Sequence, residues 1–495
     1  MRKILILILL AVVWIFSMYQ LYKKESTSGR RENFMYRKFL PSDLVLRDEW
    51  FGIYFNDNKI GYANFILGLD EVDARQGYKM EGEAFLIFPV LGTTQRIWLK
   101  IRSKIGPDYK LKSFYLSFFT GVQRTEISGI KLKENEFEVT VKEAESERKN
   151  IISIPEGVVL GNFFGPPKEL HNPRPGMKVK FLTLNPLTLQ PEEVKLTVVS
   201  REKLNIHGKN YEGFLILTEF SGLESRAWID NQGRLLKEET PLGVTLVREP
   251  QSKALEFIST TRSKGFDIAE FFSIPSNIKL PAQEIKRLYV RLLLKDIDVK
   301  QLENNRQQVL NVEDTPRGKR ILLVITNVFS PAADNTITDY LKSDNYIQSD
   351  DTRIKSIAQY LVRNLNRPGD KVKALLKWVY NYLEKRPTLS IPSALTALNA
   401  RQGDCNEHTF LFSALARSIG IPTKIKNGLV YIDGKFYYHS WPAVYINGGW
   451  VDVDPTLNQF PADATHICLV EGELSQQIDI LKLVGKIKLE VIRYE

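Results

Sequence analysis

The first residues of the chain form an almost unbroken apolar run. It extends from Ile4 to about Tyr22 between pairs of basic residues, and only Ser17 and Gln20 interrupt it. About 19 residues of helix rise roughly 30 Å, which is the thickness of the hydrocarbon core of a bilayer. A cleaved signal peptide is the alternative, but no small-residue cleavage site follows the run. We therefore predict a retained transmembrane signal-anchor over residues 1–25.

Two signals conflict about the side of the membrane on which the body of the chain lies. A short basic head before an apolar run usually stays in the cytoplasm and sends the rest across. The more numerous basic residues at 23–38 would keep the body inside by the positive-inside rule. We favour the extracytoplasmic placement, with residues 26–40 as a basic tether attracted to anionic lipid.

Beyond the tether, polar and apolar residues alternate as they do in half-buried strands. Residues 94–103 show this pattern most clearly, and Asn56-Asp57-Asn58 marks a turn between two strands. Further strand-like runs lie at 137–142, 193–200, 213–220 and 225–230. Proline-rich stretches near 166–167 and 173–175 divide this region into two halves. We predict a large antiparallel β domain over residues 41–265, either sandwich-like or a curved half-barrel.

Helical periodicity enters only in the last third of the chain. Residues 352–365 and 370–384 carry apolar side chains at three- and four-residue spacing, separated by a break at 366–369. Before them, residues 287–294 and 320–327 are strand-like. We therefore predict a small β-containing connector at 266–345 and an α+β domain at 346–495.

Composition and charge narrow the class of protein. With 43% hydrophobic and 25% charged residues, the chain is globular rather than disordered. The net charge of +10 is spread among many acidic residues, which argues against a nucleic-acid partner. Two cysteines cannot form a disulfide scaffold, and no phosphate-binding or dinucleotide motif is present. We predict no cofactor, and the sequence leaves the oligomeric state open.

One cysteine stands at the start of a predicted helix. Asp404 and Glu407 have the spacing of a capping box, an apolar face follows, and Gly420 and Pro422 supply the stop. Cys405 is the first residue of this helix. The unpaired N–H groups and the positive end of the macrodipole favour a thiolate there, with a lowered pKa.

A histidine and a carboxylate lie on a predicted hairpin further along. Residues 436–446 alternate as a strand, Asn447-Gly448 is a signal for a two-residue loop, and 450–454 is the return strand. With that loop, His439 and Asp454 fall on the same face, one diagonal step of about 7–8 Å apart. Their side chains can therefore meet.

A cysteine, a histidine and a carboxylate so arranged are typical of thiol acyl-transfer enzymes. The thiolate of Cys405 would attack a carbonyl carbon, and His439 would protonate the leaving amine. Asp454 would fix the tautomer of the histidine ring. The acyl group would then pass to water or to another amine.

Three blocks of the sequence resemble the signature of the transglutaminase-like superfamily. They are Gly403-Asp404-Cys405, His439-Ser440-Trp441 and the stretch 450–456, and the resemblance covers about residues 350–475. It implies a papain-like fold for this region, with Cys405 as nucleophile, His439 as base and Asp454 as carboxylate. Members of the superfamily include cross-linking enzymes, proteases, amidases, deamidases and inactive relatives.

Supporting roles are predicted for a few other residues. The backbone N–H of Cys405 and the side chain of Asn399 or Gln402 are candidate oxyanion donors. Trp441 flanks the hairpin and either lines the acyl cleft or packs in the core. We interpret His408 as a residue that either packs in the core or supports the site from behind, and His466 and Cys468 as buried packing residues. We predict no metal site, because the spacings of these residues match no common metal pattern.

The sequence thus predicts a membrane-anchored thiol enzyme that acts on amide bonds of proteins or peptides. Whether it cross-links, deamidates or hydrolyses depends on the acyl acceptor. The alternative is a non-catalytic binding or assembly protein that uses the transglutaminase-like fold as a scaffold.

Overall fold

The computed structural model describes residues 47–495 apart from 71–76, 109, 122, 144–145, 161–169, 186–187, 257–266, 282–283, 296, 329–333, 335, 388–392 and 473–478. The predicted anchor at 1–25 and tether at 26–40 lie outside the described residues. None of the helices in the described part is long and apolar enough to cross a bilayer.

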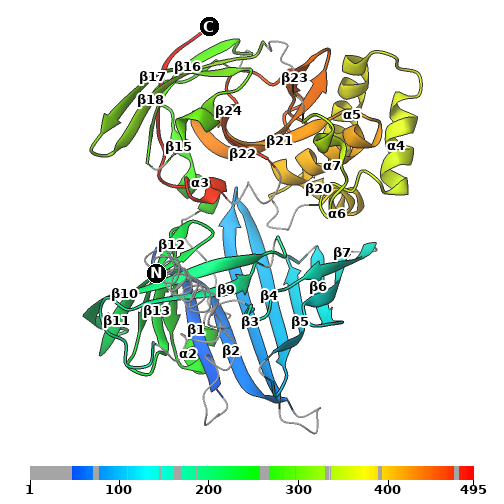
Figure 1. Cartoon of the computed structure of the whole chain (residues 1–495). Helices are drawn as coiled ribbons and strands as arrows, with labels where there is room; N and C mark the ends of the chain where they lie inside the picture. Colours follow the sequence, from blue (N-terminus) through cyan, green and yellow to red (C-terminus); the bar gives the residue numbers. More distant parts are fainter. Residues whose placement is uncertain are drawn as a thin grey trace, which may run out of the picture.

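A single antiparallel sheet of 14 strands makes up the lower part of the molecule (Figure 1). Strands β1 to β8 run outward one after another, and β9 lies at the opposite edge of the sheet. Strands β9 to β14 then return, so that β14 pairs with β1. The strands are β1 Arg47–Phe55, β2 Asn58–Asp70, β3 Gly77–Val90, β4 Thr93–Ile105, β5 Leu111–Phe119, β6 Arg124–Lys131, β7 Glu136–Glu143, β8 Ser146–Ser153, β9 Lys178–Leu184, β10 Pro191–Ile206, β11 Lys209–Phe220, β12 Leu223–Ile229, β13 Leu235–Glu239 and β14 Val244–Arg248.

The sheet curves strongly, so its two ends share one core. Ile105 and Phe114 from β4 and β5 belong to the same buried cluster as Phe181 and Val194 from β9 and β10. Of the two predicted shapes, the curved half-barrel is the one found. Strands β8 and β9, which precede and follow the proline-rich stretches, are the two edges of one sheet, so the region is not divided into separate sheets. Residues 166–167 themselves lie outside the described residues.

Local sequence explains several of these strands. Asn56 and Asp57 both adopt positive φ angles, 45° and 62°, and join β1 to β2 at the predicted turn. Each of the strand-like runs singled out in this region overlaps an observed strand, from β4 to β12.

The upper part of Figure 1 holds two further sheets and the longer helices. One sheet has the order β15-β22-β21-β24 with β23 paired to β22, and the other has the order β17-β18-β16-β25. Their strands are β15 Ile274–Pro275, β16 Arg287–Leu294, β17 Gln307–Thr315, β18 Gly318–Thr326, β21 Thr423–Ile432, β22 Lys435–Ile446, β23 Gly449–Asp452, β24 Ile467–Glu471 and β25 Lys488–Tyr494. A small parallel pair joins β19 Glu384–Lys385 to β20 Gln402–Gly403.

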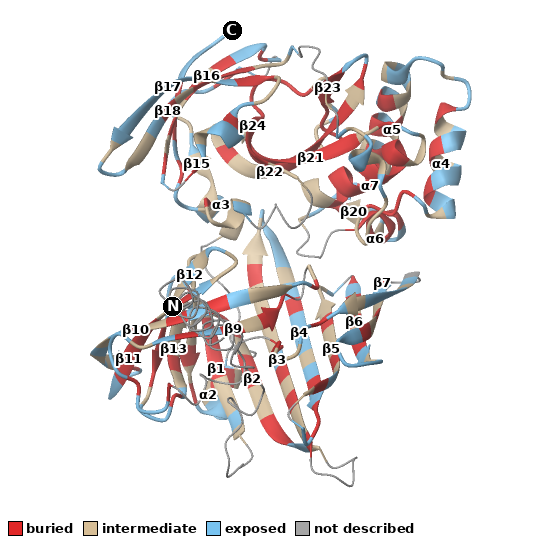
Figure 2. Cartoon of the chain, viewed as in Figure 1, coloured by how far each residue is buried: buried red, intermediate tan, exposed pale blue. Residues whose placement is uncertain are grey.

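The predicted helical periodicity is confirmed within a few residues at the ends. Helices α4 and α5 match the segments 352–365 and 370–384, whereas the short helix α6 was not predicted. The helices are α2 Gln251–Leu255, α3 Ile268–Phe272, α4 Thr352–Val362, α5 Pro368–Tyr382, α6 Ala394–Ala400 and α7 Cys405–Ser418, with 3-10 turns η4 Val299–Leu302 and η5 Asp339–Leu341. Helix α7 is buried along nearly its whole length, between α4 to α6 and strands β21 and β22 (Figure 2).

The connector and the last segment of the chain share a sheet and a core. Strand β25 pairs with β16 of the predicted connector. Leu288 and Leu292 of β16 lie in one buried cluster with Leu429 of β21 and Phe436 of β22. The domain boundaries at 265 and 345 stay predictions, but packing is continuous across the second of them.

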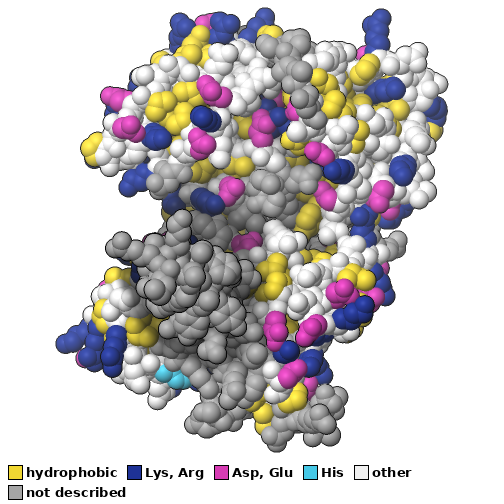
Figure 3. All heavy atoms as spheres, in the orientation of Figure 1, with side chains coloured by type: hydrophobic (Ala, Val, Ile, Leu, Met, Phe, Trp, Pro, Cys, Tyr) yellow, Lys and Arg dark blue, Asp and Glu magenta, His cyan; other side chains and the backbone are white. Residues whose placement is uncertain are grey.

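Polar contacts join the large sheet to the upper part. The buried carboxylate of Glu143 in β7 accepts hydrogen bonds from Ser393 Oγ at 2.5 Å and Thr396 Oγ1 at 3.1 Å. Arg148 donates to the Asp344 carbonyl at 3.0 Å. On the face drawn in Figure 3, acidic and basic side chains are interspersed over both parts.

Candidate active site

The N-terminus of α7 is built as its sequence predicts. The Asp404 carboxylate accepts from the Asn406 N–H at 2.8 Å, and Glu407 Oε2 accepts from the Asp404 N–H at 2.9 Å. This is a complete capping box. A Cβ on Gly403 would stand 2.3 Å from the Cβ of Glu407, so only glycine fits where Glu407 folds back over the chain. The Gly-Asp-Cys block therefore has a steric reason as well as a capping one.

Helix α7 brings Cys405 against strand β22. Thr409 Oγ1 donates to the Ser440 carbonyl at 3.0 Å, which fixes one turn of the helix to this strand. The backbone of Ser440 lies close enough to Cys405 to lower the pKa of its thiol. Cys405 as a residue is partly exposed, but its thiol is buried and lies beside Ser440, the residue that follows His439.

The predicted resting thiolate is not supported. Burial raises the pKa of the Cys405 thiol well above its ordinary value, and the carboxylate of Asp404 adds to this, while the Ser440 N–H acts in the opposite direction. The capping carboxylate that starts the helix therefore opposes the effect of the helix terminus on the thiol. The raised pKa favours the neutral thiol rather than the predicted thiolate at neutral pH.

The hairpin that carries the histidine has the predicted loop. Asn447 and Gly448 adopt φ angles of 52° and 81°, as a two-residue turn of type I′ requires. Tyr445 pairs with Trp450, and the β22–β23 ladder continues to the pair Ala443 and Asp452. One more hydrogen bond, from the Val453 N–H to the Pro442 carbonyl, follows these pairs, and a turn then sets the position of Asp454.

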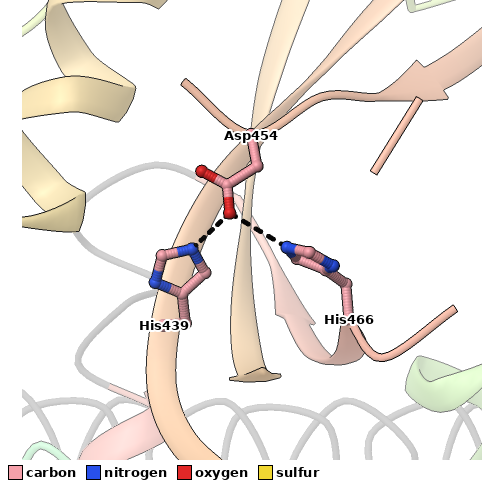
Figure 4. Close-up of side chains that lie close together, drawn as sticks. All are labelled: His439, Asp454 and His466. Carbon is pink, nitrogen blue, oxygen red and sulfur yellow. Dashed lines mark hydrogen bonds and ion pairs between the residues drawn. The ribbon is translucent and has the colours of Figure 1, made fainter. Parts of the chain in front are cut away.

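That turn holds the Asp454 carboxylate firmly. Oδ1 accepts from the backbone N–H groups of Thr456 at 2.7 Å and Leu457 at 2.9 Å, and the Asp454 backbone pairs with Gln459. Oδ2 is thereby directed at the hairpin, where it lies 2.8 Å from His439 Nε2 (Figure 4). Both side chains are buried.

The hydrogen bond fixes the roles of the two ring nitrogens of His439. Because Asp454 accepts at Nε2, the proton sits there, and Nδ1 is the nitrogen left to exchange a proton with a thiol. Burial alone would raise the pKa of Asp454, but His439 and then His466 hold it well below its usual range. The carboxylate is therefore charged and orients the ring.

The other predicted site residues lie in different places. Trp441 is fully buried, donates from Nε1 to Asp452 at 2.8 Å and stacks on the His439 ring, so it supports the histidine from the core. The Asn399 amide accepts from Arg353 of α4 on the surface, which gives it a partner outside the site. Gln402 lies in β20, two residues before the capping carboxylate Asp404.

Two residues interpreted as packing differ from each other. Cys468 is buried in β24, and burial raises the pKa of its thiol strongly. His466 is equally buried but hydrogen-bonds Asp454 Oδ2 at 3.0 Å, which the sequence reasoning missed. A usable signal existed, since a buried polar ring in an apolar strand needs partners.

His408 and the possible metal ligands complete the survey. His408 Nδ1 lies 2.7 Å from the Asp404 carbonyl, and burial lowers the pKa of the ring. Ligand atoms of His439, Asp454 and His466 lie within 4.8 Å of one another, as a metal site would require. Hydrogen bonds among the three account for the same arrangement, and the absence of a metal stays a prediction.

A cysteine at the start of a helix that packs against the strand of a histidine–carboxylate pair is the arrangement typical of thiol acyl-transfer enzymes. Residues 355–455 match the sequence model of the transglutaminase-like superfamily, and this segment contains Cys405, His439 and Asp454. This part of the chain is therefore a transglutaminase-like domain, as the signature blocks indicated.

Solved structures with low sequence identity also resemble the chain. A candidate cysteine protease from Cytophaga hutchinsonii is 19% identical, with a TM-score of 0.28, over 42% of this chain and 83% of that one. The periplasmic domain of TgpA from Pseudomonas aeruginosa, solved bound to ethylmercury, is 13% identical, with a TM-score of 0.25, over 38% of this chain and 93% of that one. A search of curated proteins finds no sequence match.

Proposed function

We propose that the chain is a membrane-anchored thiol enzyme that acts on amide bonds of proteins or peptides through Cys405, His439 and Asp454. The observation that carries the proposal is the buried 2.8 Å hydrogen bond between His439 Nε2 and Asp454 Oδ2, on the strand that packs against the start of α7. A scaffold has no need of a charged carboxylate held in the core to orient one imidazole, because burying a charge costs free energy.

The first half of the reaction forms an acyl-enzyme. His439 Nδ1 takes the thiol proton of Cys405 as the sulfur bonds to the carbonyl carbon of the substrate. Negative charge develops on the carbonyl oxygen, and the Cys405 backbone N–H at the helix terminus would stabilise it, with Gln402 as a second candidate donor. The carbon–nitrogen bond then breaks, and His439 passes its proton to the leaving amine.

The second half regenerates the thiol. Water or an amine attacks the thioester carbon while His439 Nδ1 accepts the proton of the attacking group. The carbon–sulfur bond breaks, and the sulfur recovers a proton from His439. Throughout, Asp454 keeps the other ring proton on Nε2 and stabilises the imidazolium. Water as the acceptor gives hydrolysis or deamidation, and a lysine amine gives a cross-link.

The membrane placement belongs to the same proposal. The apolar run within residues 1–25 would anchor the chain, and the body would lie outside the cytoplasm, where envelope proteins or peptides would be its substrates. Protease protection of intact cells tests this, since an extracytoplasmic body is degraded and a cytoplasmic one survives.

The reaction is tested with the full-length chain in mild detergent and an activated ester, p-nitrophenyl acetate. The mixture is quenched in acid and the modified peptide is identified by mass spectrometry. We expect acetylation at Cys405, turnover of the ester, and loss of both in Cys405→Ala and His439→Gln. Cys468→Ala is the matched control and should behave as wild type.

The same experiment separates the proposal from its alternative. No acetylation of Cys405, or equal acetylation in wild type and His439→Gln, contradicts the enzyme proposal and favours the scaffold. With methylamine present, N-methylacetamide as product indicates acyl transfer, whereas acetate alone indicates hydrolysis.

A further inference from the structure

A second histidine shares the carboxylate of the proposed centre. His466, directly before β24, is fully buried, and its Nε2 lies 3.0 Å from the same Asp454 oxygen that binds His439. Figure 4 shows Asp454 between the two rings. The other nitrogen of His466, Nδ1, lies 3.3 Å from the carboxylate of Asp463.

Both ring nitrogens of His466 therefore face carboxylate oxygens. A neutral imidazole has only one N–H, so one nitrogen would turn a lone pair towards an oxygen that can only accept. An imidazolium donates from both nitrogens and satisfies both contacts. The geometry thus requires a protonated ring. In agreement, Asp454 and Asp463 outweigh burial and raise the pKa of His466 to about 9.

The charged groups around this ring come from four segments. Asp454 follows β23, Asp463 lies in the loop before β24, and His439 belongs to β22, with 5.8 Å between the centroids of the two imidazoles. From the connector, Arg306 donates to the Asp463 backbone carbonyl at 2.7 Å. Trp441, which is uncharged, covers one side of the ring.

We propose that His466 is a positioning residue: as an imidazolium between Asp454 and Asp463, it fixes the shared carboxylate that orients His439, and its charge influences the pH dependence of the centre. The proposal rests on the function proposed above and adds a control of its pH dependence. A positive His466 disfavours a second positive charge on the neighbouring ring and competes with it for the Asp454 oxygen, so loss of this charge should move the pH profile of Cys405 reactivity to higher pH.

The size of the effect follows from the separation of the rings. Two unit charges 5.8 Å apart at an effective dielectric constant of about 20 shift a proton equilibrium by roughly two pH units. Mobile water and relaxation of the protein reduce this shift. Removing the charge of His466 should therefore move the acid side of the pH profile of Cys405 reactivity to higher pH by about one unit.

The test measures the rate of Cys405 alkylation by iodoacetamide against pH in wild type and His466→Gln, using the full-length chain. Glutamine can still hydrogen-bond Asp454 but carries no charge. The pH midpoint of alkylation should rise by about one unit in the variant. His207→Gln is the control, because His207 lies on the large sheet and pairs with Glu249. Its profile should match wild type.

Ring-nitrogen shifts in histidine-labelled wild type give a second readout that needs no variant. The chain has five histidines, so the signals can be assigned, and His466 should be doubly protonated at pH 7. A neutral His466 at pH 7, or an unshifted alkylation profile in a folded variant, overturns the proposal. Failure of acyl-enzyme formation would refute the proposed function instead, since neither of these readouts requires an acyl substrate.

Discussion

Asp454→Asn is the substitution whose outcome the structure defines most closely. The carboxylate accepts four hydrogen bonds, two backbone N–H groups at Oδ1 and the rings of His439 and His466 at Oδ2. Asparagine has one accepting oxygen, and keeping it on the two backbone groups turns its NH2 towards both rings. His439 must then leave Nε2 unprotonated and carry its proton on Nδ1.

This change of tautomer disables the proposed base. Nδ1 is the nitrogen that must accept the Cys405 proton, so we expect acyl-enzyme formation to slow by about 10³–10⁴-fold, the loss typical of a wrong tautomer in a triad. Two charge-assisted hydrogen bonds also become neutral ones. At about 1–1.5 kcal/mol each, the free energy of unfolding should fall by about 2–3 kcal/mol at pH 7.

The assay combines rapid-quench acetylation of Cys405 with urea denaturation of the same preparation. Asp463→Asn is the matched control, because Asp463 contacts His466 and has no hydrogen bond to His439. Its rate of acetylation should stay within about tenfold of wild type. A folded Asp454→Asn chain that acetylates within tenfold of wild type would refute the tautomer argument.

Three further predictions concern the helix start, the contact between the two parts, and pH. Gly403→Ala places a Cβ 2.3 Å from the Cβ of Glu407 and so disrupts the capping box. We expect the free energy of unfolding to fall by about 1–2 kcal/mol and alkylation of Cys405 to slow. Gly369→Ala is the control and should have neither effect, because the atom nearest to its new Cβ is 3.9 Å away. Burial raises the pKa of Glu143, so this carboxylate binds a proton more readily in the folded protein than in the unfolded chain. The folded protein therefore loses stability as pH rises and the carboxylate ionises. Glu143→Gln can still accept the hydrogen bonds of Ser393 and Thr396, so it should raise the melting temperature at pH 8. The corresponding gain in the free energy of unfolding is about 1 kcal/mol and should disappear near pH 4. A lower melting temperature at pH 8 would contradict this prediction. The pKa of His466 is raised to about 9, so the stabilisation that its charge provides is complete below the unfolded pKa of about 6.5 and is lost as pH rises through 9. In urea titrations, the free energy of unfolding of wild type should fall by on the order of 2–3 kcal/mol across that window. His466→Gln should lose much less.

The parts of the site that the sequence predicts correctly are encoded locally. Asp404 and Glu407 signal the helix start within four residues, and Asn447-Gly448 specifies the loop that places His439. Such short-range signals depend little on the rest of the fold. The pairing of His439 with Asp454 follows from them, although a turn and not the ladder sets the final position of the carboxylate.

The features that the sequence does not reveal depend on distant contacts. Burial decides the pKa of Cys405, and burial is a property of the packed domain rather than of the helix start. His466 gains its role only when Asp454 and Asp463 meet around it. Likewise β25 pairs with β16 across about 200 residues, so neither strand alone indicates its partner.

The central claim, that His439 activates Cys405, is tested most directly by the rate of iodoacetamide alkylation of Cys405 at pH 7. The matched comparison is wild type against His439→Gln in the full-length chain, with Cys468 as the internal reference. Because burial raises the thiol pKa, reaction at this pH needs the base. The account predicts that Cys405 reacts at least about tenfold faster in wild type than in the variant, with Cys468 inert in both. Equal rates at Cys405 in the two chains would contradict it.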